Sequence, residues 1–320
     1  MQVKFWGTRG SLPVAMKADK VRGKIVQALQ AARGKNLDDD QAIADFVDND
    51  LDFSVAGTYG GASSCVEIDF GDDEFVLCDM GSGLREFGFD SLRRINEGGK
   101  KGAYSFFMSH PHWDHIMGFP FFAPAFMPTN NLKIHGGHDI EFALRRQQDN
   151  PSFPVPLDWM GAPREFHVMK DGEVLDTGAF TVKIRKQPHH GDSYGYRFEK
   201  GGKTVVYTTD AEHKLDDLDD FNAHIDFMRD ADLVIFDTMY SMADAISVKE
   251  DWGHSSNIVA VDMCHQAGVK HLAMFHHEPV FDDAMILQNH TETIRYEELV
   301  RPGEDVLRIS CAYDGLVIDL

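Results

Sequence analysis

A dense motif of metal-ligand side chains constrains this chain more than any other feature. The segment Ser109-His110-Pro111-His112-Trp113-Asp114-His115 places three imidazoles and one carboxylate within six residues. Phe106-Phe107-Met108, just upstream, is typical of a buried strand that ends where the motif begins. Imidazole and carboxylate are the usual ligands of zinc, manganese and iron ions. We therefore predict a strand-end loop that binds metal rather than a solvated histidine-rich turn.

The spacing within the motif indicates two adjacent ions. His110 and His112, two residues apart, can point the same way from an extended or loop segment. Asp114 and His115 then project differently and can reach a second ion. One short loop can therefore supply ligands to two metals.

Further ligands are expected where later predicted strands meet loops. The first candidate is His189 in Pro188-His189-His190-Gly191, with His190 as the alternative. The second is Asp210, which ends a strand and could bridge two ions at a separation of about 3.5–4 Å. The third is His276 in the segment Phe275-His276-His277-Glu278, with His277 as the alternative.

One more histidine suits acid–base chemistry. His254 lies in Trp252-Gly253-His254-Ser255-Ser256, immediately before an amphipathic helical pattern in which Ser255 or Ser256 can be the N-cap. A histidine titrates near neutral pH, so His254 can protonate a leaving oxygen. Either Asp237 or Glu212 could orient its ring.

Composition narrows the class of protein. The chain has 320 residues, 43% hydrophobic and 26% charged, and a formal net charge of −21. This charge argues against RNA or another nucleic acid as a partner, because such binding depends on Lys and Arg at phosphates. The four cysteines form no C-x-x-C pair and predict no disulfide framework. With no signal-peptide pattern and no apolar span, we expect a cytoplasmic protein that does not enter a membrane.

The order of strand-like and helix-like segments predicts an α+β architecture. Two packed sheets flanked by helices are expected, within a single domain over residues 1–320. Apolar residues at helical spacing between residues 17 and 50 predict two helices joined by a turn. They form a helical insertion over about residues 15–56, whose role as a lid or as a dimer contact stays open. The sequence pattern predicts strands over residues 3–6, 58–70, 74–78, 132–135, 173–175, 180–185, 195–199, 204–208, 233–236, 271–275 and 315–320.

Taken together, these residues resemble the metallo-β-lactamase superfamily along nearly the whole chain. The resemblance implies a four-layer αββα sandwich and a binuclear centre. It assigns His110, His112 and His189 to one ion. It assigns Asp114, His115 and His276 to the other, with Asp210 shared, and gives Asp79 a structural or supporting role.

Three further segments are similar to the phosphodiesterase branch of that superfamily: Lys4–Ser11, Tyr59–Cys65 and Asp79–Gly83. This branch includes tRNase Z and cyclic-nucleotide phosphodiesterases of the anti-Pycsar type. His254 matches its additional catalytic histidine. The resemblance implies two divalent ions, zinc by default, although manganese, iron, cobalt or nickel suit similar ligands. It also implies a homodimer, because dimers are common in this branch.

We therefore expect a metal-dependent phosphodiesterase that hydrolyses a small phosphodiester, above all a cyclic nucleotide. The expected catalytic residues are Asp114, which orients the attacking water, and His254, the general acid; Asp210 is the alternative for orienting the water. Phe119, Phe121, Phe122 and Tyr194 are candidates for stacking on a base, and Arg9 for meeting a phosphate. The alternatives are a tRNA 3′-processing endonuclease, an ester, lactone or thioester hydrolase, and a non-catalytic metal-binding protein.

Overall fold

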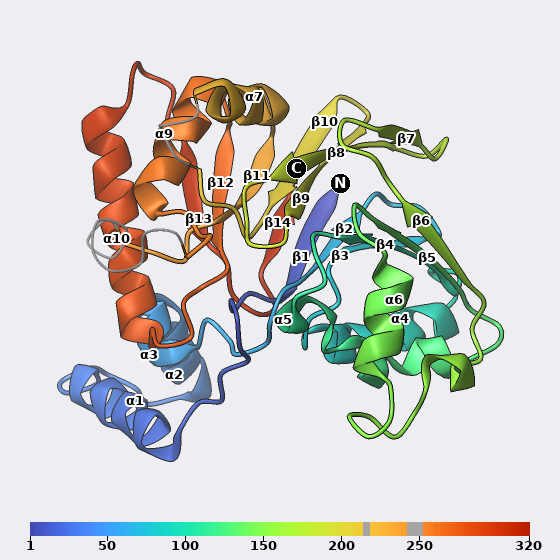
Figure 1. The fold of residues 1–320 in the computed structure, drawn as a ribbon. Coiled ribbons are helices and arrows are strands. Elements are labelled where there is room, and N and C mark those ends of the chain that lie inside the picture. Colours follow the sequence, from blue (N-terminus) through green and yellow to red (C-terminus); the bar gives the residue numbers. More distant parts are fainter. Residues whose placement is uncertain (214–217, 242–251) are drawn as a thin grey trace.

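Two seven-stranded mixed sheets form the centre of the computed structural model, which describes residues 1–213, 218–241 and 252–320 (Figure 1). The first sheet has, in spatial order, β14 (Val317–Asp319), β1 (Gln2–Gly7), β2 (Cys65–Asp69), β3 (Phe75–Cys78), β4 (Ala103–Met108), β5 (Asn131–Gly136) and β6 (Arg164–Val168). The second has β13 (Arg308–Cys311), β12 (His271–Phe275), β11 (Leu233–Asp237), β10 (Lys203–Thr208), β9 (Ser193–Lys200), β8 (Thr181–Gln187) and β7 (Val174–Asp176). Strands β3 to β6 run parallel in the first sheet, as do β10 to β13 in the second.

Both sheets are covered on their two faces, and the side chains of their central strands alternate between the core that the sheets share and the cores under the helices. In β4, Phe107 points into the core between the sheets, whereas Phe106 packs under the helices on the outer face. In β11, Ile235 points inward and Val234 outward in the same way. Successive side chains of a strand face opposite sides, so a strand covered on both faces must be apolar throughout.

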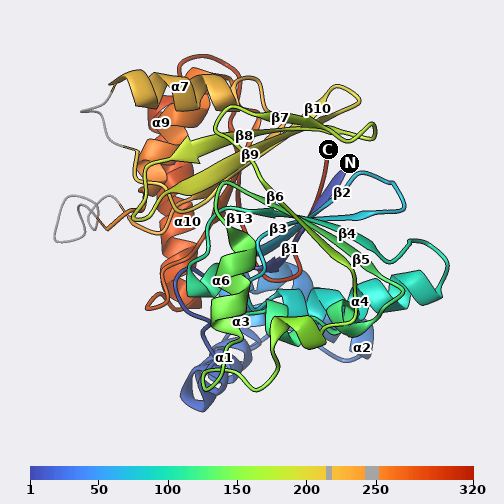
Figure 2. The same ribbon diagram turned by 45° about the vertical axis from the view of Figure 1, so that its right-hand side comes forward.

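Helices cover the two outer faces. The first sheet is covered by α4 (Leu84–Asn96), α6 (Ile140–Gln147) and the short helices α5 (Trp113–Ile116), η2 (Phe119–Phe121), η3 (Ala123–Phe126) and η4 (Leu157–Trp159). The second is covered by α7 (Leu218–Met228), α9 (Asn257–Ala267) and α10 (Asp283–Val300). Figure 2 shows the helix–sheet–sheet–helix order, which confirms the predicted αββα architecture.

The predicted helical insertion lies between β1 and β2. It comprises α1 (Ala18–Ala31), α2 (Asp40–Asp45), the π-helix η1 (Phe46–Asp50) and α3 (Phe53–Ala56), and it lies outside the four layers at the lower left of Figure 1. Phe53 packs against Tyr59 and Tyr313, with ring centroids 5.0 and 4.5 Å apart. Lys24 pairs with Asp283 at the start of α10. These contacts attach the insertion to the body at the α10 end.

Some predicted element boundaries were wrong. The strand expected from Thr58 begins only at Cys65, because side chains bind the backbone amides before it: Asp283 accepts from Tyr59, and Asp314 accepts from Gly61 and Ala62. The sequence also did not predict β6, β13 or α7. All four cysteines are free, in agreement with the prediction of no disulfide framework, and all four are buried. Within the described residues, no helix combines the length and the apolar character that are needed to span a membrane.

Candidate metal centre

Four strand ends of the two sheets bring the predicted ligands together. The motif from His110 to His115 follows β4, and its last residues form α5. His189 follows β8, Asp210 follows β10, and His276 follows β12 directly. The strands therefore deliver ligands from distant parts of the sequence to one edge of the sandwich.

Left-handed backbone conformations turn the ligands into this edge. Asp210 and His276 have backbone φ values of 47° and 61°, which residues other than glycine seldom adopt. Such conformations persist where the surrounding structure enforces them, and they are common at functional sites. Gly10 makes room for one of them, because a Cβ atom on it would lie 2.6 Å from His276 Nδ1.

Three histidines form the first ligand group. His110, His112 and His189 offer nitrogens within 4.8 Å of one another. His189 Nε2 lies 3.3 Å from His112 Nδ1, and the rings of His110 and His112 are 4.3 Å apart. Three histidines are also the protein ligands of one class of catalytic zinc site.

Asp114, His115, Asp210 and His276 form the second group, which is fully buried. His115 Nε2 lies 3.1 Å from Asp114 Oδ2, and His276 Nε2 lies 3.4 Å from the same oxygen. Oδ1 of Asp210 is 3.3 Å from His115 Nε2 and 3.1 Å from His276 Nε2.

Asp210 joins the two groups through its two oxygens. While Oδ1 faces the second group, Oδ2 lies 3.8 Å from His110 Nε2 and 3.9 Å from His189 Nε2 in the first. One carboxylate therefore faces both groups, which is the arrangement that a bridging ligand needs.

Unpartnered buried atoms indicate that these groups fit cations. His110 Nε2, Asp114 Oδ2, His115 Nε2 and His276 Nε2 are buried and have no hydrogen-bond partner among the described residues. Buried polar atoms are normally paired, so a cluster of unpaired acceptors on both sides of one carboxylate needs a ligand. The His and Asp side chains therefore suit divalent metal ions, and all seven predicted ligands lie in the two groups.

Charge and burial set the protonation of the ligands. Burial and the neighbouring imidazoles lower the pKa of His110 well below its usual value, and burial also lowers the pKa of His112 and His189. Burial raises the pKa of Asp210, but the imidazoles of His276 and His115 outweigh it and hold the pKa well below its usual range. Burial lowers the pKa of His115, but the carboxylates of Asp114, Asp210 and Asp79 outweigh it and raise that pKa well above its usual value. Metal binding needs neutral imidazoles and ionised carboxylates, so a bound ion would displace the metal-facing proton of His115.

A buried carboxylate fixes the ring of His115. Asp79 Oδ2 accepts hydrogen bonds of 2.7 Å from His115 Nδ1, from the Ser109 hydroxyl and from the Tyr207 hydroxyl. The Ser109 hydroxyl lies 3.0 Å from His110 Nδ1 as well. Hydrogen bonds of this kind hold Nδ1 protonated and leave Nε2 free for a metal. Asp79 thus lies where the family resemblance implied a supporting residue, whereas the contacts of Ser109 and Tyr207 were not predicted.

His254 stands beside the two groups and is held by Asp237. Its Nδ1 lies 2.8 Å from Asp237 Oδ2, which resolves the alternatives left open by the sequence. Burial lowers the pKa of His254, but the Asp237 carboxylate outweighs it and raises the pKa to about 9. Glu212 instead accepts a hydrogen bond of 3.0 Å from the Gly253 amide, and the Gly253 carbonyl accepts from His189 Nδ1 at 2.8 Å.

Several alternative candidates lie elsewhere. His277 is buried against the Ala312 carbonyl, with Nε2 2.7 Å from that oxygen, and His190 lies in neither ligand group. The Arg9 guanidinium donates to the backbone carbonyls of Gly60, Glu278 and Phe281, so it stabilises loops.

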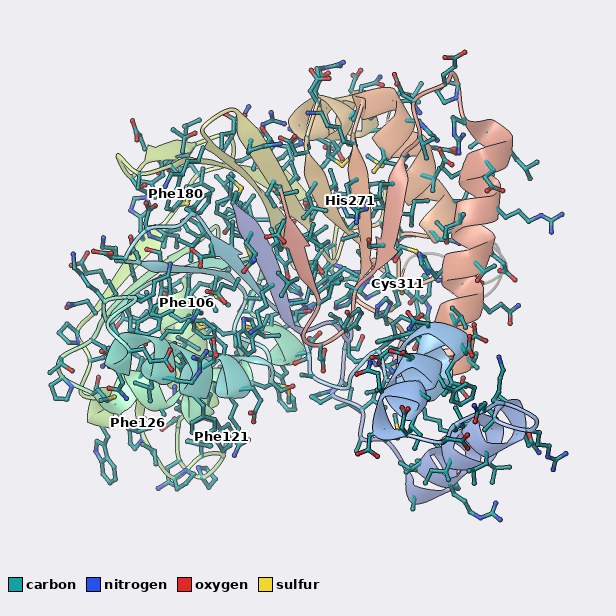
Figure 3. The ribbon with its side chains drawn as sticks, turned by 180° about the vertical axis from the view of Figure 1, so that it is seen from behind. Phe106, Phe121, Phe126, Phe180, His271 and Cys311 are labelled. Atoms are coloured by element: carbon teal, nitrogen blue, oxygen red, sulfur yellow. The ribbon has the colours of Figure 1, made fainter. Side chains whose placement is uncertain are left out.

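The aromatic candidates for stacking divide between core and surface. Phe119 and Phe122 are fully buried in the core under α4, and Tyr194 packs against His138. In the half of the molecule that contains the first sheet, Phe121 is exposed at the lower edge and Phe106 is buried in the interior (Figure 3).

Comparisons with known proteins agree with this architecture. A model of the β-lactamase superfamily domain matches residues 76–277, a range that includes all seven predicted ligands. Ribonuclease Z of Oceanobacillus iheyensis is 24% identical, in an alignment that covers 53% of this chain and 69% of that protein.

Solved structures share the fold over almost the whole chain. The metallo-β-lactamase fold protein YhfI from Bacillus subtilis has a TM-score of 0.63 at 19% identity and covers 99% of this chain and 98% of its own. A diphosphatase from the PhnP family has a TM-score of 0.60 at 18% identity, with coverages of 100% and 97%. Zinc-bound PqqB from Methylobacterium extorquens has a TM-score of 0.63 at 14% identity, with full coverage of both chains. The chain therefore belongs to the β-lactamase superfamily, as one of its metal-dependent hydrolases with the metallo-β-lactamase fold.

Proposed function

We propose that the protein is a two-metal phosphodiesterase that hydrolyses a small nucleotide phosphodiester, with a cyclic nucleotide as the expected substrate. One ion would be held by His110, His112 and His189. The other would be held by Asp114, His115 and His276, and Asp210 would bridge them. Two bound divalent ions, zinc by default, would activate a water and neutralise charge on the phosphoryl oxygens.

The observation that carries the proposal is the His254–Asp237 pair beside the bridged ligand groups. His254 lies at the edge of the site, its ring 5.1 Å from His276 and 5.4 Å from His189. Protonated on both nitrogens, it can donate a proton from Nε2 to a departing alkoxide while Asp237 holds Nδ1. Bound cations would lower the raised pKa of His254 towards neutrality, which suits a general acid. Alkoxide departure from phosphorus needs such a proton donor.

The other residues position the reaction. Asp114 has one oxygen in the second ligand group and is the proposed group that orients the attacking water. Asp79 and the Gly253 carbonyl hold His115 and His189 as ligands through their Nδ1 atoms. The similarity to ribonuclease Z supports phosphodiester chemistry.

Two exposed tryptophans favour a substrate that carries an aromatic base. Trp113 directly follows His112 and is 83% exposed, and Trp252 directly precedes Gly253 and is 59% exposed. Trp113 is thus next in sequence to one histidine of the first ligand group, and Trp252 is next to the residue whose carbonyl accepts from His189. Bases stack on such side chains with about 1–3 kcal/mol each. These tryptophans replace Phe119 and Phe122 as the proposed stacking residues.

A metal-quantified activity panel tests the proposal. The protein, loaded with zinc, is assayed on 3′,5′- and 2′,3′-cyclic nucleotides, a nitrophenyl phosphodiester, precursor tRNA and a lactone. We expect turnover of cyclic nucleotides, loss of metal and activity in His189→Ala, and neither loss in the control His190→Ala. Inertness towards every phosphodiester, with the lactone hydrolysed, would contradict the proposal.

The base-stacking proposal has its own test. Trp113→Ala should raise KM for a cyclic nucleotide by about 5- to 150-fold, the range that corresponds to one stacked base. KM for a cyclic phosphodiester without a base should stay unchanged. The control is Trp159→Ala, which removes a tryptophan that is 70% exposed in η4. Equal effects on both substrates would refute stacking.

The similarity to ribonuclease Z favours one second candidate, a tRNA 3′-processing endonuclease. It would use the same ligands and the same general acid. Salt-dependent cleavage of precursor tRNA in the panel, without turnover of cyclic nucleotides, would select it.

A further inference from the structure

The helical insertion is divided into two halves of opposite charge. Its basic half, residues 17–35, contains six lysines and arginines and one aspartate. Its acidic half, residues 36–56, contains seven aspartates and neither lysine nor arginine. The chain as a whole carries a net charge of −21, so the basic half stands out from the rest of the molecule.

Part of this charge points outward without an intramolecular counterion. Pairs within the chain join Lys20 to Asp282, Lys24 to Asp283 and Lys35 to Asp50. In contrast, Arg22 and Arg33 are exposed and form no ion pair with any described residue, and the same holds for Asp38 and Asp48. Both halves therefore have charges available for a partner.

Apolar side chains accompany these charges. Helix α1 has no buried residue. Val21, Ile25 and Leu29, spaced four residues apart on one face of this helix, are 43%, 55% and 66% exposed. Ile43 on α2 is 46% exposed. Apolar side chains rimmed by charge are typical of protein–protein contact surfaces.

We propose that the insertion is the interface of a two-fold symmetric homodimer. A two-fold interface brings the same patch of both copies together, so the patch must be complementary to itself. Adjacent basic and acidic halves meet this requirement, because the basic half of one copy can face the acidic half of the other. Nucleic acid or an anionic membrane would attract the basic half, but the seven neighbouring aspartates would repel their phosphates.

The interface does not depend on the proposed reaction. Figure 1 shows the insertion outside the four layers, on the side of α10. The insertion supplies none of the seven predicted metal ligands.

Paired charge reversals of the full chain test the interface by sedimentation equilibrium. Arg22→Glu/Arg33→Glu makes the basic half acidic, and Asp38→Lys/Asp48→Lys makes the acidic half basic. Each pair should raise the dimer dissociation constant by about tenfold or more, because like charges placed opposite one another disfavour association. Mixing the two variants should restore a dimer, because each reversed half then meets its opposite. The control Arg146→Glu/Arg295→Glu, which changes exposed arginines on α6 and α10, should leave the dimer intact.

Rescue by mixing separates loss of the interface from misfolding, since misfolded chains would not reassociate. Leu29→Ser, which changes no charge, should also weaken the dimer. A wild-type protein that stays monomeric at all concentrations would overturn the proposal. So would a dimer that neither reversal weakens. Loss of RNA or anionic-vesicle binding in Arg22→Glu/Arg33→Glu, with the mass unchanged, would assign the surface to those partners instead.

Discussion

Replacing Asp237 with asparagine should disable the proposed general acid without changing the shape of the site. Asp237 Oδ2 accepts from His254 Nδ1 at 2.8 Å, and Oδ1 accepts from the Met239 amide at 3.0 Å. Asparagine has one carbonyl oxygen, so it can accept only one of these two bonds. Its amide then faces a second N–H donor, and either the His254 ring or the Met239 amide loses its partner.

The size of the effect follows from the role of His254. The Asp237 carboxylate is the leading attraction that raises the pKa of His254 against the opposing effect of burial. Without it, His254 is a weaker base that is less often protonated and less well oriented. General acid catalysis contributes about 10²- to 10⁴-fold, or roughly 2.7–5.4 kcal/mol of barrier. We expect Asp237→Asn to lose kcat in this range while it keeps its metal.

Two substrates with different leaving groups provide the assay. A cyclic nucleotide releases an alkoxide, which needs a proton, whereas a nitrophenyl phosphodiester releases a stable anion that does not. Asp237→Asn and His254→Ala should both lose most of the turnover of the first substrate and little of the second. The double variant should be no worse than His254→Ala, because the two residues act as one unit. Equal losses on both substrates, at full metal content, would refute the general-acid role.

Three further predictions concern the metal centre. Tyr207→Phe removes a hydrogen bond to Asp79 and should weaken metal affinity by about 10- to 100-fold, measured by competition with a chelator. The control Tyr196→Phe, which removes a hydroxyl bound to the Met108 carbonyl, should change stability but not affinity. The kcat of the wild type on a cyclic nucleotide should fall as pH rises through the pKa of His254, because only the protonated ring is an acid, and a pH profile of His254→Ala should lack this fall. Removal of the metal ions with a chelator should lower Tm, because ions at a thousandfold excess over their Kd stabilise the folded state by about 4 kcal/mol. An unchanged Tm in calorimetry would show that metal binding does not stabilise the fold.

The ligand set could be predicted because each ligand adjoins a strand in the sequence. The motif His110–His115 follows an apolar run, and Asp210 and His276 end two others. Parallel strands of one sheet end at a shared edge, so the strand pattern was enough to place Asp210 and His276 together. Their grouping with the motif that follows β4, in the other sheet, came from the family resemblance. The ligand groups in the structure contain all seven predicted side chains, and metal binding by them stays a prediction.

Other features depend on tertiary geometry that no local pattern encodes. The hydrogen bond between Tyr207 and Asp79 joins residues 128 positions apart, on different sheets. The choice between Asp237 and Glu212 depends on where the loop before α9 meets β11. Phe119 and Phe122 were hard to separate from Phe121, because only the 3₁₀ turn puts the first two in the core.

Stepwise metal titration of the metal-free protein, with cyclic-nucleotide hydrolysis as the readout, tests the central claim most directly. Because Asp210 faces both ligand groups, we predict little activity after one equivalent of zinc and full activity only after the second. Full activity at one equivalent, or none at two, would contradict a two-metal phosphodiesterase.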